Sequence, residues 1–481
     1  MGQDRFRLGL TFDDVLLVPK RSAVASRAEV STRTRLCRGI EMAIPIVSAN
    51  MDSVTESEMA IAMARVGGIG IIHRFLPIER QAAEVRRVKR AESVVIERPY
   101  TFAPHQTLRE AVAFMTEHGS AGLLVVDADG RLLGLVTARD LLFEEDLDQP
   151  ITRVMTPRER LVTAPPDVTI EEAKEILHRH RIEKLPLVDE EGRLRGLITT
   201  RDIQNRLRYP NATKDAKGRL RVGAAVGIRG DFLERAAALV AEDVDVLVVD
   251  VAHGHSEGVL RALERLREEF PRVPLIAGNV ATAEGARDLI AAGAAAVKVG
   301  VGPGSTCTTR IVTGAGVPQL TAILDAARAA RPHDVPVIAD GGIRTSGDIT
   351  KALAAGASSV MLGNLLAGTE ESPGALIVQG GRQYKTYRGM ASLWATARRK
   401  ALDSPVEDED LSSIVAEGIE ARVPYRGKVA DVVSQLVGGL RSGMSYCGAR
   451  TIPELWENAE FVRITPAGLR ESLPHDVEPL S

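Results

Sequence analysis

The sequence predicts an α/β protein, a (β/α)8 TIM barrel with a second module inserted into one of its loops. Short apolar runs alternate with helical stretches along most of the chain, as parallel strands joined by helices do. The glycine-rich loop at 300–310 lacks the Gly-x-Gly-x-x-Gly spacing of a dinucleotide-binding sheet, which favours a closed barrel. An internal repeat interrupts the alternation between residues 95 and 205.

The strands and helices of the barrel follow from this alternation. Two strands, 44–48 and 69–72, flank a predicted helix over 57–66. Six more strands come after the inserted module, at 222–227, 246–250, 275–278, 294–299, 337–339 and 359–362. Helices are predicted between them at 232–242, 256–269, 282–292, 319–330 and 347–355. In such a barrel the chemistry lies at the carboxyl ends of the strands.

The inserted module contains two copies of one unit. Thr107–Ala111 is echoed by Thr169–Ala173, and Gly134–Asp140 is echoed by Gly196–Asp202. Both pairs are offset by 62 positions (169 − 107 and 196 − 134). A constant offset indicates a duplicated helix–strand–strand–helix unit whose two copies pack together.

The composition excludes several classes of protein. The chain has 481 residues, enough for two or three domains, and a net charge of −3, which gives no sign of a nucleic-acid partner. Three cysteines, Cys37, Cys307 and Cys447, do not make a disulfide framework and fit a reducing compartment. No apolar run approaches the roughly 20 residues of a membrane span, and the N-terminus is polar. We therefore expect a cytoplasmic protein that binds neither membrane nor nucleic acid.

A cysteine lies in the loop that follows the predicted strand 294–299. The loop runs Gly-Val-Gly-Pro-Gly-Ser-Thr-Cys-Thr-Thr-Arg, with the cysteine at Cys307 and a cation at Arg310. Its glycines leave backbone N–H groups open to a phosphate, and a thiol beside a cation suits a nucleophile. The alternative is an inert core cysteine, but the polar, turn-rich surroundings favour the nucleophile.

Other predicted strands also end in small or polar residues. Asp340-Gly341-Gly342 and Gly363-Asn364 resemble the phosphate grip that barrels build after late strands, and Asp340 suits a ribose diol. A plain turn is the alternative for Asp340-Gly341-Gly342. His253, after the strand 246–250, is either a site residue or a satisfied structural histidine.

These features divide the chain into three parts. The barrel occupies 1–94 and 206–481, and the module occupies 95–205. A charged, aperiodic segment at about 388–428 interrupts the second part of the barrel. We interpret this segment as a mobile flap over the site; the alternative is a disordered stretch without function.

Four motifs give the chain a family resemblance. They are Leu10–Val15, Gly302–Arg310, Ile338–Ile343 and Gly438–Met444, and together they resemble the IMP dehydrogenase / GMP reductase family over nearly the whole chain. The duplicated unit resembles a pair of cystathionine-β-synthase (CBS) domains. The family resemblance implies that Cys307 attacks C2 of a purine nucleotide and forms a covalent thioimidate, while hydride passes between C2 and a nicotinamide cofactor.

The resemblance also implies the contacts of each ligand. The residues expected to bind the substrate, GMP or IMP, are Ser305, Asp340, Gly342, Gly363, Asn364, Tyr387, Gly389 and Met390. Those expected to bind the cofactor, NADPH or NAD, are Asp250, Ser256 and Asn279. A monovalent cation such as K⁺ would be held by backbone carbonyls of Gly302, Gly304 and Cys307, with Glu471 and Ser472 supplied by a neighbouring subunit.

The CBS resemblance implies a regulatory purine nucleotide. Its ribose would be held by Thr137, Asp140, Thr199 and Asp202. The alternative is that the two aspartates only cap helices. The family also implies a homotetramer, with an octamer as the alternative.

The two branches of the family differ in one chemical step. A dehydrogenase hydrolyses the thioimidate with an Arg-Tyr pair on the flap, where this sequence has Asp403-Ser404. Loss of a positioned general base costs roughly 10²- to 10⁴-fold in rate. A reductase instead handles the proton of departing ammonia with a threonine and a glutamate, here Thr309 and Glu417, although dehydrogenases can carry the same two residues. Asn50 is also typical of reductases.

We therefore interpret the chain as a GMP reductase with Cys307, Thr309 and Glu417 as catalytic residues. Similarity at Asp250–Ser256, at Pro474-His475-Asp476 and in the inserted module favours the alternative, an IMP dehydrogenase with a substitute base. A nucleotide sensor without activity is a third hypothesis, against which the intact Cys307 loop argues.

Overall fold

The computed structural model describes residues 6–92, 95–393, 395, 415–475 and 477. The chain divides into two compact units. The barrel unit comprises Met1–Ala91, Asn211–Asp215 and Leu220–Ser481, and the repeat unit comprises Glu92–Pro210 and Ala216–Arg219. No helix in the described part of the chain is long and apolar enough to cross a membrane.

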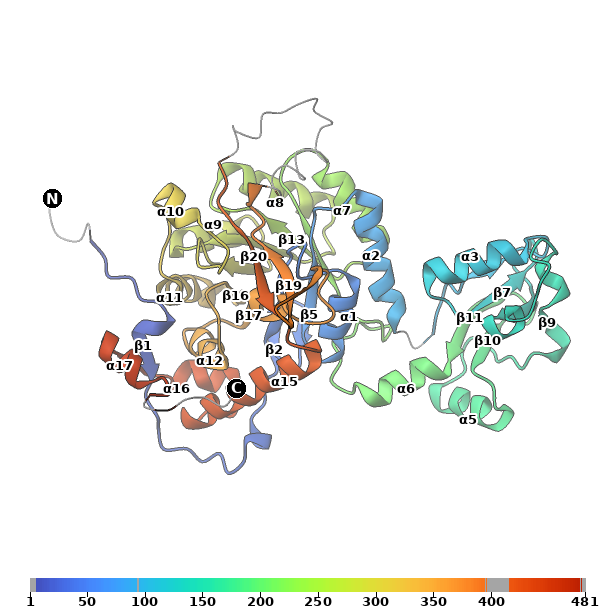
Figure 1. Ribbon diagram of the computed structural model, residues 1–481, viewed down its shortest axis with the longest axis horizontal. Coiled ribbons are helices and arrows are strands. Elements are labelled where there is room, and N and C mark those ends of the chain that lie inside the picture. The colour runs from blue at the N-terminus through green and yellow to red at the C-terminus, as the bar shows by residue number, and fades with distance from the viewer. Residues whose placement is uncertain (1–5, 93–94, 394, 396–414, 476, 478–481) are drawn as a thin grey trace. The chain divides into compact units, whose positions relative to one another are not determined.

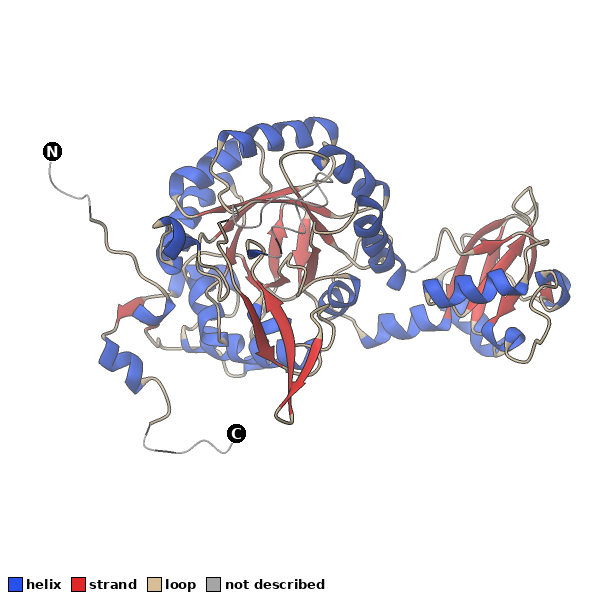
Figure 2. Ribbon diagram, turned by 45° about the horizontal axis from the view of Figure 1, so that its top comes forward, coloured by secondary structure: helices blue, strands red, loops and turns tan. Residues whose placement is uncertain are grey.

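Eight parallel strands close into a barrel, as Figure 2 shows, which confirms the predicted fold class. The strands, in their order around the barrel, are β12 (Gly223–Val226), β13 (Val246–Asp250), β14 (Leu275–Val280), β15 (Ala296–Val299), β16 (Val337–Asp340), β17 (Ser359–Leu362), β4 (Ile46–Ser48) and β5 (Ile69–Ile72). Pairing of β5 with β12 closes the ring. All eight predicted strands are in the barrel.

Helices surround the barrel (Figure 1). Those that follow its strands in the chain are α1 (Ser57–Arg65), α2 (Ile78–Ala91), α7 (Phe232–Ala241), α8 (Glu257–Glu269), α9 (Ala283–Ala291), α10 (Thr309–Thr313), α11 (Gln319–Ala330), α12 (Ser346–Ala354) and α13 (Asn364–Ala367). Local sequence sets their starts. At α12, for example, the hydroxyl of Thr345 accepts from the backbone of Asp348, and the carboxylate of Asp348 accepts from the backbone of Thr345.

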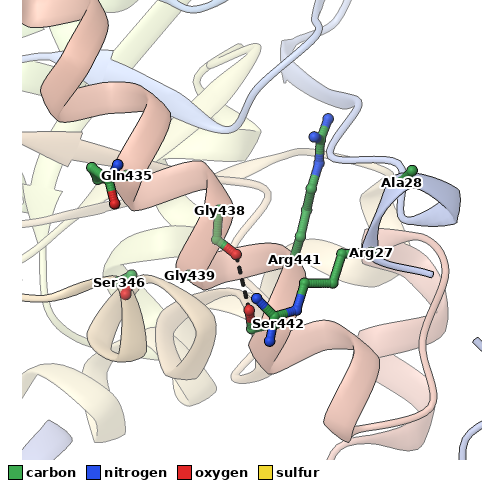
Figure 3. Close-up of a pocket in the computed structure, with 8 residues that line it drawn as sticks. All are labelled: Arg27, Ala28, Ser346, Gln435, Gly438, Gly439, Arg441 and Ser442. Carbon is green, nitrogen blue, oxygen red and sulfur yellow. Dashed lines mark hydrogen bonds between the residues drawn. The ribbon is translucent and has the colours of Figure 1, made fainter.

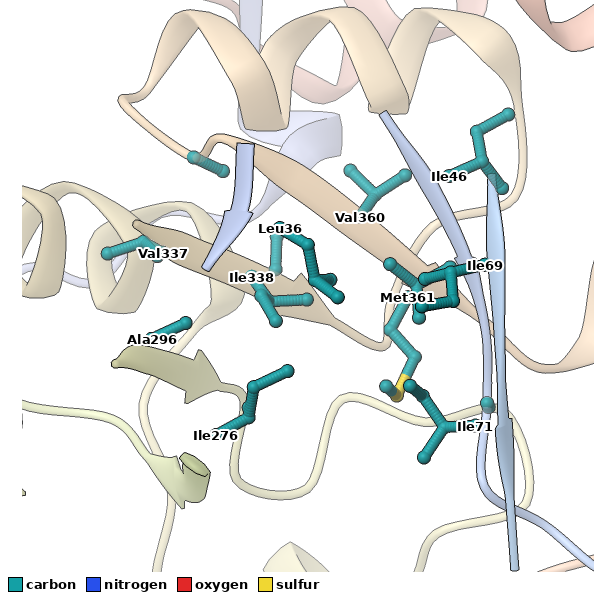
Figure 4. Packing of buried hydrophobic residues seen from close by; sticks show 14 of the residues in the cluster. Leu36, Ile46, Ile69, Ile71, Ile276, Ala296, Val337, Ile338, Val360 and Met361 are labelled. Atoms are coloured by element: carbon teal, nitrogen blue, oxygen red, sulfur yellow. The ribbon is translucent and has the colours of Figure 1, made fainter. Parts of the chain in front are cut away.

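The barrel interior is packed with large apolar side chains. Ile71, Ile276, Ile338 and Met361 come from four different strands and are at most 1% exposed. Figure 4 shows them in one cluster. Burial of such side chains contributes roughly 1.5–3 kcal/mol each, so the barrel is a rigid support for the loops at its carboxyl end.

A three-stranded antiparallel sheet, absent from the sequence prediction, supports the ends of the flap. It consists of β18 (Leu376–Gln379), β19 (Arg382–Arg388) and β20 (Glu420–Pro424). β19 and β20 pair from Tyr384 with Pro424 to Arg388 with Glu420. The start and the end of the flap are therefore held side by side.

The ends of the barrel unit pack on its side. Strand β1 (Val15–Leu17) pairs with β21 (Phe461–Arg463), and β2 (Thr34–Cys37) pairs with β3 (Ile40–Met42). The C-terminal helices are α15 (Val429–Tyr446), α16 (Ile452–Asn458) and α17 (Pro466–Glu471). A Cβ on Gly439 of α15 would lie 2.1 Å from Oγ of Ser346, so glycine is needed where α15 meets α12.

The repeat unit contains two copies of helix–strand–strand–helix. The first copy has α3 (Leu108–His118), β7 (Gly122–Val126), β8 (Leu132–Thr137) and α4 (Ala138–Leu141). The second has α5 (Ile170–His180), β10 (Lys184–Val188), β11 (Leu194–Thr199) and α6 (Thr200–Arg208). Each element of the second copy starts 62 positions after its counterpart (170 − 108, 184 − 122, 194 − 132, 200 − 138). Short strands β6 (Thr101–Phe102) and β9 (Thr156–Pro157) extend the first sheet.

The two copies exchange equivalent hydrogen bonds. The N–H of Leu132 donates to the carbonyl of Gly192 at 3.0 Å, and the N–H of Leu194 donates to the carbonyl of Gly130 at 2.9 Å. Leu124, Leu132, Val188 and Leu197, drawn from both copies, share one apolar cluster. The duplication in the sequence thus produces a nearly two-fold arrangement.

Candidate functional site

The loop after β15 carries Cys307 at the carboxyl end of the barrel. The N–H of Cys307 donates to the carbonyl of Gly304 at 3.1 Å, which forms a tight turn. The thiol is half-buried and donates a hydrogen bond to Oγ1 of Thr309 at 3.1 Å. Helix α10 begins at Thr309, with Thr308 as its N-cap, so this hydrogen bond ties the thiol of the loop to the first residue of the helix.

Glycines let this loop pack against the loop after β16. A Cβ on Gly300 would lie 2.0 Å from the carbonyl oxygen of Asp340, and φ of Gly300 is +147°. Gly341, at φ +91°, would bring a Cβ to 2.9 Å from Cγ of Pro303. Only glycine permits both the backbone conformation and the close approach. The thiol loop and the Asp340 loop therefore form one continuous surface.

The far end of the flap docks on the thiol loop. The N–H of Thr308 donates to the carbonyl of Glu417 at 2.9 Å, and the N–H of Ile419 donates to the carbonyl of Thr306 at 2.9 Å. Cys307 and Gly418 form a backbone bridge between these bonds. The backbone of Glu417 is thus adjacent in space to the loop that carries Cys307 and Thr309.

Tyr387 joins three loops beside the thiol. It is buried, and burial raises the pKa of its hydroxyl, while hydrogen bonds with Ser305 and Thr306 act in the opposite direction. A Cβ on Gly363 would lie 2.9 Å from the hydroxyl oxygen of Tyr387. Ser305, Gly363 and Tyr387 therefore converge, and Asn364 follows as the first residue of α13. Hydroxyl groups and a helix start in one place suit a phosphate.

An ion pair fixes the near end of the flap. Nε of Arg388 donates to both carboxylate oxygens of Asp52, at 3.0 and 2.9 Å, and the Asp52 side chain is 1% exposed. The hydrogen bonds to Asp52 raise the pKa of Arg388. Gly389 follows, where a Cβ would come within 2.9 Å of the carbonyl oxygen of Thr306. Half-buried Met390 is next in the chain.

A buried lysine, not singled out from the sequence, links three predicted site residues. Nζ of Lys298 donates to Oδ2 of Asp340 at 2.9 Å and to Oδ1 of Asp250 at 3.5 Å, and it also bonds to Oδ1 of Asn279. A lysine in the otherwise apolar strand β15 was the signal available in the sequence, because charged groups are rarely buried without partners.

Other predicted residues lie apart from this cluster. Ser256 is the N-cap of α8, and no hydrogen bond of its side chain joins it to the cluster within the described residues. Glu471 and Ser472 are exposed at the end of α17, where the hydroxyl of Ser472 donates to the carbonyl of Gly468 at 2.8 Å. His253 is exposed. Two positions on, Nε2 of His255 lies 2.7 Å from Oδ2 of Asp288. Asp403-Ser404 of the flap lies outside the described residues.

The predicted nucleotide residues of the repeat unit cap two helices. The hydroxyl of Thr137 donates to the carboxylate of Asp140 at 2.7 Å at the start of α4, and Thr199 pairs with Asp202 in the same way at the start of α6. Burial raises the pKa of Asp202, against the effect of its bonds to Thr199. The capping role left open by the sequence is therefore present, and nucleotide binding stays a prediction.

The backbone carbonyl groups of the Cys307 loop are suitable ligands for a monovalent cation. Backbone carbonyls replace the hydration shell of such ions in other proteins, and the carbonyl of Gly304 keeps one lone pair after accepting from Cys307. Within the described residues, no group of three or more His, Cys, Asp or Glu side chains is arranged to hold a metal.

A separate pocket lies between α12, α15 and the turn at Arg27–Glu29 (Figure 3). Its volume is about 580 Å³. The lining residues are Arg27, Ala28, Ser346, Gln435, Gly438, Gly439, Arg441 and Ser442. None of the predicted site residues lines it, so it is distinct from the site at the carboxyl end of the barrel.

The fold and the site together define a (β/α)8-barrel protein with a cysteine loop and converging hydroxyl groups at the carboxyl ends of its strands. The family profile described as "IMP dehydrogenase / GMP reductase domain" matches residues 9–475. The chain belongs to this family, and it is an oxidoreductase of purine metabolism.

Known relatives come from both branches. The chain is 57% identical to an inosine-5'-monophosphate dehydrogenase from Nitrosopumilus maritimus over 98% of this chain and 99% of that protein. It is 59% identical to the same enzyme from Aquifex aeolicus over 99% and 97%. Among solved structures, GMP reductase from Trypanosoma brucei in complex with guanosine 5'-monophosphate is 47% identical, with a TM-score of 0.92 over 98% of this chain and 99% of that chain.

Proposed function

We propose that the protein is a GMP reductase, which converts GMP and NADPH to IMP, ammonia and NADP⁺ through a covalent bond between Cys307 and C2 of the purine. The observation that carries the proposal is the hydrogen bond between Cys307 and Thr309, with Glu417 docked beside them. This arrangement offers a nucleophile and a proton carrier together.

The sequence of the flap supports the reductase over the dehydrogenase. No Arg-Tyr dipeptide occurs between Arg388 and Lys428, and Asp403-Ser404 stands where the pair is expected. A reductase needs no such base, because ammonia leaves and no water enters. The likeness to a GMP reductase structure over 98% of the chain agrees with this assignment, since that likeness includes the inserted unit.

Each group has a defined task in the proposed reaction. The thiolate of Cys307 bonds to C2, and Thr309 with Glu417 delivers a proton to the departing amino group as the C2–N bond breaks. Asp340 accepts hydrogen bonds from the ribose. The residues proposed to hold the phosphate are Ser305, Gly342, Gly363 and Tyr387. Met390 and Glu417 would face the base, and Asn364 and Gly389 complete the proposed substrate site.

The cofactor would be held beside this site. Asp250 and Asn279 offer a carboxylate and an amide at neighbouring strand ends, and we add Ser256 from the start of α8. When bound, NADPH would supply hydride to C2, and the bond between C2 and the Cys307 sulfur would then break to release IMP and the free thiolate. In the alternative reaction NAD would accept hydride from C2. A cation such as K⁺ on the carbonyls of Gly302, Gly304 and Cys307, completed by Glu471 and Ser472 of a second copy, would order the thiol loop.

We extend the proposal to regulation and assembly. The repeat unit is proposed to be a pair of CBS domains, occupying 95–205, that bind a purine nucleotide through Thr137, Asp140, Thr199 and Asp202. A cytoplasmic homotetramer, with an octamer as the alternative, would be the working form.

IMP dehydrogenase is the second candidate, in which IMP, NAD⁺ and water give XMP and NADH. It is favoured by the names of relatives that are 57% and 59% identical to this chain. In that case a group other than an Arg-Tyr pair must activate water against the thioimidate.

A two-way assay on the purified protein separates the candidates. GMP with NADPH is supplied in one reaction and IMP with NAD⁺ in the other, with nicotinamide absorbance followed and purines separated by chromatography. NADPH oxidation with release of IMP and ammonia is expected. Steady NADH formation with release of XMP would instead identify a dehydrogenase, and no turnover in either reaction would favour a sensor.

A further inference from the structure

The ammonium group of Lys298 lies beneath both proposed nucleotide sites. Its side chain is 3% exposed, whereas those of Asp340 and Asp250 are 21% and 20% exposed. An ammonium group has three donors and no acceptor. Here they reach Asp340 from β16, Asp250 from β13 and Asn279 from β14. One side chain from β15 thus connects three other strands.

These bonds orient Asp340. Its Oδ2 accepts from Nζ of Lys298 at 2.9 Å and from Nδ2 of Asn279 at 2.9 Å. The same amide donates to the carbonyl of Gly300 at 2.7 Å, at the start of the thiol loop. Within the described residues no hydrogen bond reaches Oδ1 of Asp340, so that oxygen remains to accept from a ligand.

The charge of Lys298 stabilises the two carboxylates of Asp340 and Asp250 in the same region. Two carboxylates that face one site repel each other, and a nearby cation removes that repulsion. Burial lowers the pKa of Lys298, but attraction to Asp340 and Asp250 outweighs it, so the pKa is raised and the amine stays charged. Removal of the ammonium would leave the two carboxylates without their shared cation and free to rotate apart.

We propose that Lys298 is a positioning residue that couples the substrate and cofactor sites, because a single ammonium group fixes Asp340 for one nucleotide and Asp250 for the other. The inference rests on the proposed function for the names of the two ligands. It goes beyond that function by predicting that the two affinities depend on one buried group that touches neither nucleotide.

The test compares two buried lysines. Nζ of Lys89 also meets two carboxylates, Asp215 at 2.9 Å and Asp245 at 2.8 Å, and Lys89 is 5% exposed. Asp245 precedes β13, at the end of the barrel opposite the site. Lys298→Met and Lys89→Met therefore remove the same kind of group, one beneath the site and one far from it.

Steady-state KM values for GMP and NADPH, and calorimetric affinities for GMP, IMP and NADP⁺, are measured for each variant. We expect Lys298→Met to weaken both nucleotides at least tenfold, Lys298→Arg to restore most of the affinity, and Lys89→Met to lower Tm with both KM values within about twofold of wild type. Weakening of one nucleotide alone, or equal effects of the two Met variants, would overturn the inference.

A second variant keeps the inference testable if Lys298→Met does not fold. Asp250→Asn lies on the cofactor side, and the coupling predicts that it also weakens GMP binding severalfold; unchanged GMP affinity would overturn it. Failure of the proposed function is distinguishable, because the wild-type protein would then not turn over GMP, whereas calorimetry still reports whether Lys298 joins two ligand sites.

Discussion

The thiol of Cys307 donates a hydrogen bond to the hydroxyl of Thr309 at 3.1 Å. One residue separates them in the chain, Thr308, which is the N-cap of α10, and Thr309 is the first residue of that helix. The hydroxyl of Thr309 is therefore within reach of any group bonded to the sulfur.

Thr309→Val should remove the proton carrier and leave the nucleophile. Valine keeps the shape of threonine without its hydroxyl, so we expect kcat for GMP reduction to fall by roughly 10²-fold or more, with a small change in the KM for GMP. Alkylation of Cys307 by iodoacetamide should continue. Thr308→Val changes a neighbouring hydroxyl of the same loop and serves as the control; equal losses in the two variants would contradict the assigned role.

The three cysteines should differ sharply in reactivity. Burial raises the pKa of Cys37 to about 12 and also raises the pKa of Cys447, and Cys307 alone among them is not buried. At pH 9 about one Cys37 thiol in a thousand is ionised. Brief alkylation followed by peptide mass spectrometry should label Cys307, and saturating GMP should protect it. Labelling of Cys37 first would contradict the structure.

The pair of Asp52 and Arg388 should be needed for both stability and turnover. Asp52→Asn leaves the Arg388 guanidinium without its carboxylate, which should cost on the order of 3 kcal/mol and lower kcat/KM by releasing the start of the flap. Thermal melting and GMP kinetics measure the two effects. Asp148→Asn, which breaks an exposed pair with Arg109, should change neither. An Asp52→Asn variant with normal kcat/KM would remove the ion pair from the account of the flap.

Gly363→Ala should obstruct the proposed phosphate grip. The new methyl would lie 2.9 Å from the hydroxyl of Tyr387 and 3.3 Å from Sδ of Met51. We expect the KM for GMP to rise roughly tenfold, which corresponds to about 1.4 kcal/mol, while NADPH binding changes little. Gly438→Ala is the control, because a Cβ there meets nothing within 4 Å. An unchanged KM in Gly363→Ala would exclude this position from the grip.

Stability should fall in alkali through Cys37. In the unfolded chain a thiol ionises near pH 8.5, whereas the folded pKa is about 12. Between these values the unfolded state binds fewer protons, so its ionisation lowers the free energy of unfolding by up to about 1.4 kcal/mol per pH unit. Urea unfolding at pH 7 and pH 10 should show a steeper loss for wild type than for Cys37→Ala. Parallel losses would contradict a protonated buried thiol.

The barrel could be predicted because its signals are local. Each strand is a short apolar run, and the sequence around Thr345 marks the start of a helix without reference to distant residues. The hairpin of β18 and β19 also had a local signal, the two-residue turn Gly380-Gly381, which the sequence prediction missed. The addition of β20 could not be predicted, since it pairs with β19 across the whole flap and no short turn joins these two strands. Pairing at that separation depends on tertiary contacts that no local pattern encodes.

The candidate site was predictable to a similar degree. Cys307, Thr309 and Asp340 lie in motifs that can be recognised in the sequence, and the structure brings their loops together. Asp52 and Arg388 form an ion pair although they are 336 residues apart in the chain, and the sequence around neither residue indicates the other as its partner. Lys298 did carry a signal, a charge inside a buried strand, but its partners could be named only once the strands were in their order around the barrel.

The pairing of β19 with β20 has an evolutionary consequence. The strands at the two ends of the flap, β19 and β20, are hydrogen-bonded to each other outside the barrel. The sequence between them can therefore differ in length or composition without moving β15 or β16. Substitutions between β19 and β20 can therefore change which groups lie over the proposed site while the loops that carry Cys307, Asp340 and Gly363 keep their positions on the barrel.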